Sequence, residues 1–225
     1  KKGGILIKKE SASLDFTELK IPRDYMYLKE EKREMNKEIS GTTRLVLCGL
    51  AIALNIVLGI VTAALKFPFY LDVMGTIFIA IYFGPWYGAV VGALTNILTS
   101  LFSGSFTGMP FMLVSIVVAL IVGFVFRKVK FNFVTALVVG IITGIAAPVV
   151  GTPIGIAVYG GLTGTISDVA VMFLKQSGAG IFAASFIPKL FNNLLDKIGS
   201  ILIVYLVVLS LPGNLKPKCF GKNKR

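Results

Sequence analysis

The chain has 225 residues, of which 55% are hydrophobic and 15% charged, and its mean hydropathy is +0.83. Because soluble proteins carry about 25% charged residues, this composition excludes an ordinary soluble domain and indicates an integral membrane protein. The net charge of +12 raises the question of nucleic-acid binding, but the basic residues beyond residue 44 flank apolar runs, as topology determinants do. We therefore expect the chain to lie in a lipid bilayer and to bind no nucleic acid.

The reactive side chains that most enzymes and metal sites need are scarce. The chain has no histidine, its two cysteines are Cys48 and Cys219, and its carboxylates beyond residue 44 are Asp72, Asp168 and Asp196. Zinc and copper sites need clustered nitrogen, sulfur or carboxylate ligands, and the chain has no nucleophile-elbow, metalloprotease or phosphate-loop motif. We expect no metal, no cofactor and no enzymatic activity.

The chain begins with a polar tail. Residues 1–40 have mixed charge and no sustained helical or strand period, which is typical of a disordered segment. Met35 is followed by NKEISGTTRLVL, which resembles a natural start, so residues 1–34 are either native or an extension upstream of it. A transmembrane substrate-binding domain is expected over residues 41–215, followed by a basic cytoplasmic tail over 216–225.

Six apolar runs follow the tail, and a membrane-crossing helix needs about 20 such residues. We predict an all-α membrane protein with six transmembrane helices in one compact bundle, at about residues 45–65, 71–83, 85–102, 111–126, from 133 onward, and 184–211. The glycines and prolines between residues 140 and 155 predict a break or re-entry after about Pro148. Residues 160–180 are expected to form a connection with a short amphipathic helix, capped by Ser167 or Asp168.

The number of spans and the positions of the basic residues predict the same topology. Six spans place both termini on one side of the membrane. The basic residues near position 44, at 127–130 and beyond 216 then fall on that same side, which the positive-inside rule identifies as cytoplasmic. We expect a multi-pass protein of a bacterial or archaeal cell membrane with both termini in the cytoplasm.

Small residues recur at helical spacing in the first and third spans. Small residues four apart let helix backbones approach closely in lipid, so we predict a packing seam in the third span at Gly84, Gly88 and Gly92. The first span has two stripes, which either pack within the chain or dock a partner membrane protein. These stripes are Gly49/Ala53 and Ala51/Asn55/Gly59/Ala63.

Polar residues collect in the predicted outer half of the bundle. Lys189, Asn192 or Asn193, and Asp196 share one face of the last span. Either the two charged residues snorkel or pair locally, or this face hydrogen-bonds a polar solute, with aromatic rings stacking on it. Asp72 either caps the second span or lies at the membrane interface, or it contacts the solute or a partner. The predicted substrate-binding residues are Asn192, Asn193, Lys189, Asp196, Tyr159, Phe186, Asp72 and Asn96.

Three segments resemble the substrate-binding S components of energy-coupling factor (ECF) transporters, and the resemblance covers about residues 40–215. The segments are LDVMGT (71–76), FGPWYGAVVGALTNILTS (83–100) and LDKIGSILIVYLVVLSLP (195–212). The resemblance implies an S-component-like fold and high-affinity capture of a vitamin or other small-molecule micronutrient.

The resemblance also implies partners, namely a transmembrane T component and two ATPase subunits. The docking pattern of the family is two alanines four apart, and this chain departs from it with the pairs Gly49/Ala53, Ala51/Asn55 and Gly59/Ala63. The alternative function is a membrane sensor or receptor domain that binds a small ligand.

Overall fold

The computed structural model describes residues 40–65, 67, 70–165 and 167–220. Most of the predicted polar tail, including Met35 as a natural start, lies outside these residues. The described chain is helical and has no strand. Its long helices are α2 (Gly41–Ala64), α3 (Met74–Phe83), α4 (Pro85–Phe102), α5 (Met112–Lys128), α6 (Phe133–Tyr159) and α8 (Ile181–Ser210), and its short ones are η1 (Phe106–Phe111), α7 (Asp168–Gln176) and η2 (Gly213–Leu215).

The predicted all-α membrane fold is confirmed. Among the described residues, four helical segments are long and apolar enough to cross a membrane, namely α2, η1 with α5, α6 and α8. The ten-residue α3 is a shorter apolar helix. Every predicted span corresponds to a helix, but α3 is too short for a hydrocarbon core that needs about 20 residues, and α4 is not among the four segments.

Local sequence signals explain where the helices begin and end. The Ser40 side chain accepts the backbone N–H of Thr43, and Asn132 begins α6 with a capping box that uses Thr135, as these residue types do at helix starts. Between α3 and α4, Gly84 has φ +100° and Pro85 occupies the first turn of α4, where proline needs no amide hydrogen.

Helix α6 corrects one prediction. It continues without a break from Phe133 to Tyr159, with Pro148 and Pro153 inside it, so the break expected after Pro148 was wrong. Its glycines serve packing: a Cβ on Gly140 or Gly144 would lie 2.9 Å from a backbone Cα of α8. Close packing against α8 holds the helix where glycine and proline alone would weaken it.

The glycine seam predicted in α4 packs as expected. A Cβ on Gly88 would lie 2.6 Å from the Ala80 side chain of α3, and one on Gly92 would lie 2.8 Å from the Ser115 side chain of α5. Since these distances leave no room for a side chain, the small residues bring α4 into close contact with both neighbours.

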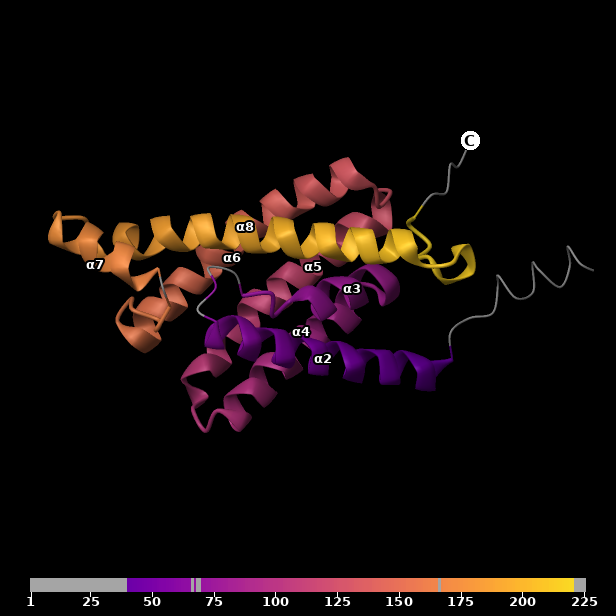
Figure 1. Ribbon diagram of the computed structural model, residues 1–225, viewed down its shortest axis with the longest axis horizontal. Helices are drawn as coiled ribbons and strands as arrows, with labels where there is room; N and C mark the ends of the chain where they lie inside the picture. Colours follow the sequence, from indigo (N-terminus) through magenta and orange to yellow (C-terminus); the bar gives the residue numbers. More distant parts are fainter. Residues whose placement is uncertain (1–39, 66, 68–69, 166, 221–225) are drawn as a thin grey trace, which may run out of the picture. The chain divides into compact units, whose positions relative to one another are not determined.

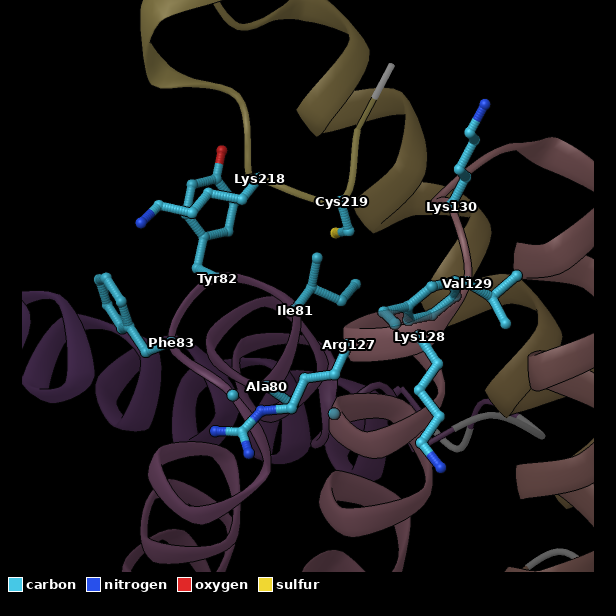
Figure 2. Close-up of a pocket in the computed structure, with 13 residues that line it drawn as sticks. Ala80, Ile81, Tyr82, Phe83, Arg127, Lys128, Val129, Lys130, Lys218 and Cys219 are labelled. Atoms are coloured by element: carbon cyan, nitrogen blue, oxygen red, sulfur yellow. The ribbon is translucent and has the colours of Figure 1, made fainter. Parts of the chain in front are cut away.

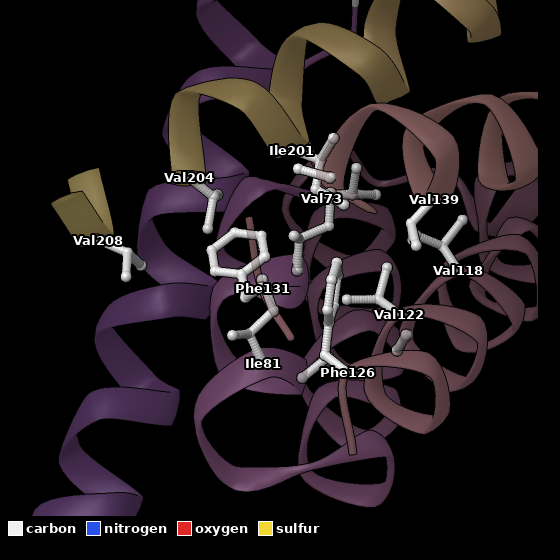
Figure 3. Close-up of a cluster of buried hydrophobic side chains, with 14 of the residues drawn as sticks. Val73, Ile81, Val118, Val122, Phe126, Phe131, Val139, Ile201, Val204 and Val208 are labelled. Carbon is white, nitrogen blue, oxygen red and sulfur yellow. The ribbon is translucent and has the colours of Figure 1, made fainter. Parts of the chain in front are cut away.

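Buried apolar side chains of α3, α5, α6 and α8 form the main core, together with Phe131 from the turn between α5 and α6. Figure 3 shows Val118 and Val122 of α5 near Val139 of α6, with Phe126 and Phe131 beside them. The rings of Phe126 and Phe131 meet edge to face, with centroids 4.7 Å apart, a favourable aromatic geometry.

The described bundle has two chemically different ends. Figure 1 shows α2 beginning and α8 ending at the end where α3 turns into α4, which we call the basic end because residues 127–130 and 216–218 lie there. At the other end lie η1, α7, residues 160–165 and residues 167–168. We call this the loop end and call residues 160–165 with residues 167–168 the 160–168 loop.

Candidate functional site

Two lysines are buried on α8, and they differ in their partners. Lys189 is 6% exposed and Lys197 is 3% exposed. Lys197 Nζ forms an ion pair with the carboxylate of Asp196, which has no exposed surface. Lys189 Nζ has no hydrogen-bond partner among the residues that the structure describes.

The carboxylate of Asp196 also holds the connection between α2 and α3. Its Oδ1 accepts the backbone N–H groups of Tyr70 (3.0 Å) and Leu71 (2.8 Å). Leu71 has φ +50°, a left-handed conformation that costs free energy in a residue other than glycine. The bonds from Asp196 therefore hold a strained turn against α8.

Two more of the predicted site residues lie beside this pair. Asp72 interacts electrostatically with Lys197 and Asp196, and the side chain of Asn192 interacts with that of Tyr70. We call Tyr70, Asp72, Asn192, Asp196 and Lys197 the Asp196 cluster. Asp72 makes no side-chain capping bond on the following helix, because α3 begins after Val73 without one.

Lys189 lies against α6 two turns before the Asp196 cluster. A Cβ on Gly155 would come within 2.7 Å of Lys189 Nζ and within 3.3 Å of the Thr163 methyl group. One turn before Gly155, Thr152 Oγ1 is also buried without a hydrogen-bond partner in the described part of the chain. We call Lys189, Thr152, Gly155 and Thr163 the Lys189 site.

The 160–168 loop is folded onto the helices beside the Lys189 site. The carboxylate of Asp168 accepts the backbone N–H groups of Thr163 (3.1 Å) and Gly164 (2.7 Å). Ser185 of α8 donates to the carbonyl of Gly161 at 3.5 Å. Asp168 thus holds the loop, and neither Asp168 nor Ser167 makes the predicted capping bond on α7, which has no side-chain cap.

Two other predicted residues line a small polar cavity at the loop end, with a volume of about 160 Å³. Asn96 Nδ2 donates to the carbonyl of Gly92 (2.9 Å) and to Ser115 Oγ (2.8 Å). The Tyr159 hydroxyl donates to Thr107 Oγ1 at 2.9 Å. The residues that line this cavity are Asn96, Thr99, Ser100, Ser103, Ser105, Thr107, Gly108 and Tyr159.

The remaining two predicted residues lie on α8. Asn193 Nδ2 donates to the Lys189 carbonyl at 2.8 Å, so its amide already bonds its own helix. Phe186 stacks on Phe182, with ring centroids 5.6 Å apart. The eight predicted residues therefore divide among the Asp196 cluster, the Lys189 site, the polar cavity and the face of α8, and do not form one continuous group.

A larger cavity of about 520 Å³ lies at the basic end (Figure 2). Its basic lining residues are Arg127, Lys128, Lys130 and Lys218. In Figure 2 the side chains of Lys128 and Lys130 point in opposite directions, so the cations spread around the rim and do not converge, as expected for basic residues that flank membrane helices. Burial raises the pKa of the Cys219 thiol in this lining to about 11, which keeps it protonated at neutral pH.

Comparison with known proteins decides the family. The model of the family described as "ECF transporter, substrate-specific component" matches residues 43–208, more than half of the chain. The chain belongs to this family. It is therefore a substrate-binding subunit of an ECF transporter, embedded in a membrane, and proteins of this kind are transporter subunits and not enzymes. Neither a curated protein nor a solved structure matches the chain.

In this ECF subunit the two small-residue stripes of α2 face different surroundings. Ala51 and Asn55 are buried: Asn55 Oδ1 accepts the backbone N–H of Gly75 (2.7 Å), and its Nδ2 donates to Thr76 (3.0 Å) and Thr95 (3.2 Å). Gly49 and Ala53 are exposed, as is Ala63, whereas Gly59 is half-buried. Ala51 and Asn55 thus pack within the chain, which leaves Gly49/Ala53 as the exposed stripe.

Sequence reasoning missed several residues that the fold brings to these groups. Lys197 follows Asp196 directly in the LDK segment, and this pair of opposite charges inside an apolar span was the available signal. Thr152 and Thr163 had no comparable signal, because threonine is common in membrane helices and loops. Tyr70 takes part through both its backbone N–H and its hydroxyl, and the backbone contact has no sequence signature.

Proposed function

We propose that this ECF subunit captures a small polar organic micronutrient, such as a water-soluble vitamin or its precursor, at the loop end. One observation carries the proposal: within the described chain, the buried ammonium of Lys189 has no partner beneath the 160–168 loop. Burying an unpaired charge is costly. A bound solute supplies the missing partner, and movement of the loop admits and retains it.

The predicted site residues take different parts in this proposal. Lys189 contacts the solute, while Asn96 and Tyr159 line the neighbouring polar cavity and extend the site toward η1. Three other predicted residues hold residues 70–71, before α3, against α8 at the loop end, and so support the site without touching the solute. These residues are Asp72, Asn192 and Asp196. Contacts of Asn193 and Phe186 with the solute stay predictions.

We further propose that the chain docks on a transmembrane T component through α2. The Gly49/Ala53 stripe is exposed, and large apolar side chains beside it, including those of Leu50, Leu54 and Val57, are exposed as well. Small residues on such a face let another helix approach closely. Two ATPase subunits bound to the T component hydrolyse ATP, and both termini of this chain lie in the cytoplasm.

Purification of the full chain from its native host in mild detergent tests this function. The expected result is copurification of one T component and two ATPase subunits, together with ATP-dependent uptake of a solute by proteoliposomes that contain the complex. Ala53→Phe should abolish the association, whereas Leu206→Phe, on the exposed surface of α8, should not. A chain that associates with no ATPase module in its host would refute the proposal.

A further inference from the structure

The Lys189 site shows what kind of solute fits it. A protonated lysine has three hydrogen-bond donors and no acceptor. Lys189 Nζ is buried and lacks a hydrogen-bond acceptor among the described residues. In a membrane protein such a group is paired or lies at a functional site, so the missing partner is an acceptor and, most favourably, an anion.

The carboxylates of the bundle are already engaged elsewhere. Asp168 attracts Lys189 electrostatically, but its two oxygens accept the backbone N–H groups of Thr163 and Gly164. Asp196 pairs with Lys197 and bonds the 70–71 backbone, and Asp72 lies near the same lysine. No described carboxylate forms an ion pair with Lys189, and Asp168 attracts it only from beyond ion-pair distance.

The surroundings of Lys189 also favour a small ligand group at this point. Gly155 has no side chain between α6 and the ammonium, and a Cβ there would come within 2.7 Å of Nζ. Thr152 lies one turn before Gly155, and its hydroxyl is the second buried polar group in this part of the described chain without a partner. A hydroxyl donates one hydrogen bond, which suits the second oxygen of a carboxylate.

On the basis of the proposed function, we infer that the captured solute is an organic acid whose single carboxylate pairs with Lys189 and accepts a hydrogen bond from Thr152. One buried cation balances one negative charge, whereas a dianionic phosphate would leave excess charge in a region of low polarity. A neutral solute would leave the ammonium without an ion-pair partner. The site therefore selects a carboxylic acid over the corresponding amide.

The test begins with the solute that the full chain carries. Wild-type protein purified from its native host is denatured, and the released small molecules are identified by mass spectrometry with and without esterification of carboxyl groups. If nothing is released, the protein is titrated with nicotinate, pantothenate and biotin and with their neutral counterparts nicotinamide, panthenol and biotinamide. The expected ligand carries one carboxylate.

Matched variants then test the role of Lys189. Lys189→Gln should weaken binding of the acid by about 10- to 100-fold, the loss expected for a charge-assisted hydrogen bond, and Lys189→Arg should retain part of it. Thr152→Val should weaken binding less. Lys175→Gln removes the same charge from the exposed face of α7 and should bind like the wild type, which excludes a general electrostatic effect.

The outcomes separate this inference from the proposed function. A neutral or cationic ligand, binding of none of the acids, or a folded Lys189→Gln variant that binds the acid as tightly as the wild type would overturn the inference. None of these results affects association with the T component and the ATPases, which tests the function itself. A thermal unfolding curve for each variant shows that lost binding is not lost folding.

Discussion

Lys189 and Lys197 occupy the same helix, two turns apart, and are buried to almost the same extent. Lys197 lies next to Asp196, and this pair holds the backbone of Tyr70 and Leu71. Asp168 attracts Lys189 electrostatically but forms no ion pair with it, and within the described chain the Lys189 ammonium contacts no acceptor. Two lysines of one helix that are buried to a similar extent therefore serve different purposes.

The difference shows how a membrane protein separates stability from binding. A buried ion pair contributes little net stability, but the removal of one partner is strongly destabilising because it leaves an uncompensated charge. By this reasoning the Asp196 cluster is sensitive to substitution and serves the fold. The Lys189 site should tolerate substitution without unfolding, since the chain itself supplies no bond that would be lost.

The largest effect is expected at the paired lysine. Asp196→Asn removes the ion-pair partner of Lys197 and should lower the free energy of unfolding by about 3–5 kcal/mol. Thermal unfolding in detergent measures the change, and adding Lys197→Met in the same chain should recover part of it. If Asp196→Asn were as stable as the wild type, the distinction between the two lysines would fail.

Two glycines of α6 provide the next test. A Cβ on Gly144 meets the backbone of Leu194, whereas one on Gly155 meets the flexible end of Lys189. Gly144→Ala should therefore lower the unfolding free energy by about 1–3 kcal/mol, the usual cost of overpacking. Gly155→Ala should cost much less stability but weaken solute binding, because it displaces the ammonium. Equal unfolding temperatures for the two variants would contradict this expectation.

A smaller effect is expected at the two asparagines of α8. Asn192→Ala removes the interaction with the Tyr70 side chain and should lower the unfolding free energy by about 1 kcal/mol. Asn193→Ala removes only a bond to its own helix and should cost less. Thermal unfolding ranks the two variants, and the reverse order would place Asn193, not Asn192, in the contacts that hold the Asp196 cluster.

The smallest change in stability is expected at Lys189 itself. Lys189→Met removes a buried charge that has no acceptor in the described chain, so the ligand-free variant should unfold at the same temperature as the wild type or slightly higher. Lys197→Met is the matched control and should unfold at a lower temperature. Strong destabilisation by Lys189→Met would show that the lysine serves the fold and not a solute.

Much of the fold could be predicted because membrane helices are local structures. The third span was predicted over residues 85–102 and forms α4 over the same residues. The seam of Gly88 and Gly92 packs as its spacing predicted. The fifth span was predicted less well. The glycines and prolines of α6 suggest a break, and its packing against α8 cannot be read from the sequence.

Less of the candidate site could be predicted. Helical spacing placed Lys189 and Asp196 on one face. It did not show that Asp196 forms an ion pair with Lys197 and accepts backbone N–H groups more than a hundred residues away in the sequence. Nor did it separate Ala51 and Asn55, which pack inward, from Gly49 and Ala53, which are exposed. These outcomes depend on which neighbour each side chain meets.

The sequence alone determined that the chain is an all-α membrane protein, that glycine seams join its helices, and that it resembles the ECF substrate-binding subunits. Composition and short-range periodicity carry this information, because lipid requires each spanning segment to bond its own backbone. Tertiary structure alone decided which buried charge is neutralised within the chain. That depends on contacts between segments far apart in sequence, and among the described residues it leaves Lys189 as the buried lysine without an acceptor.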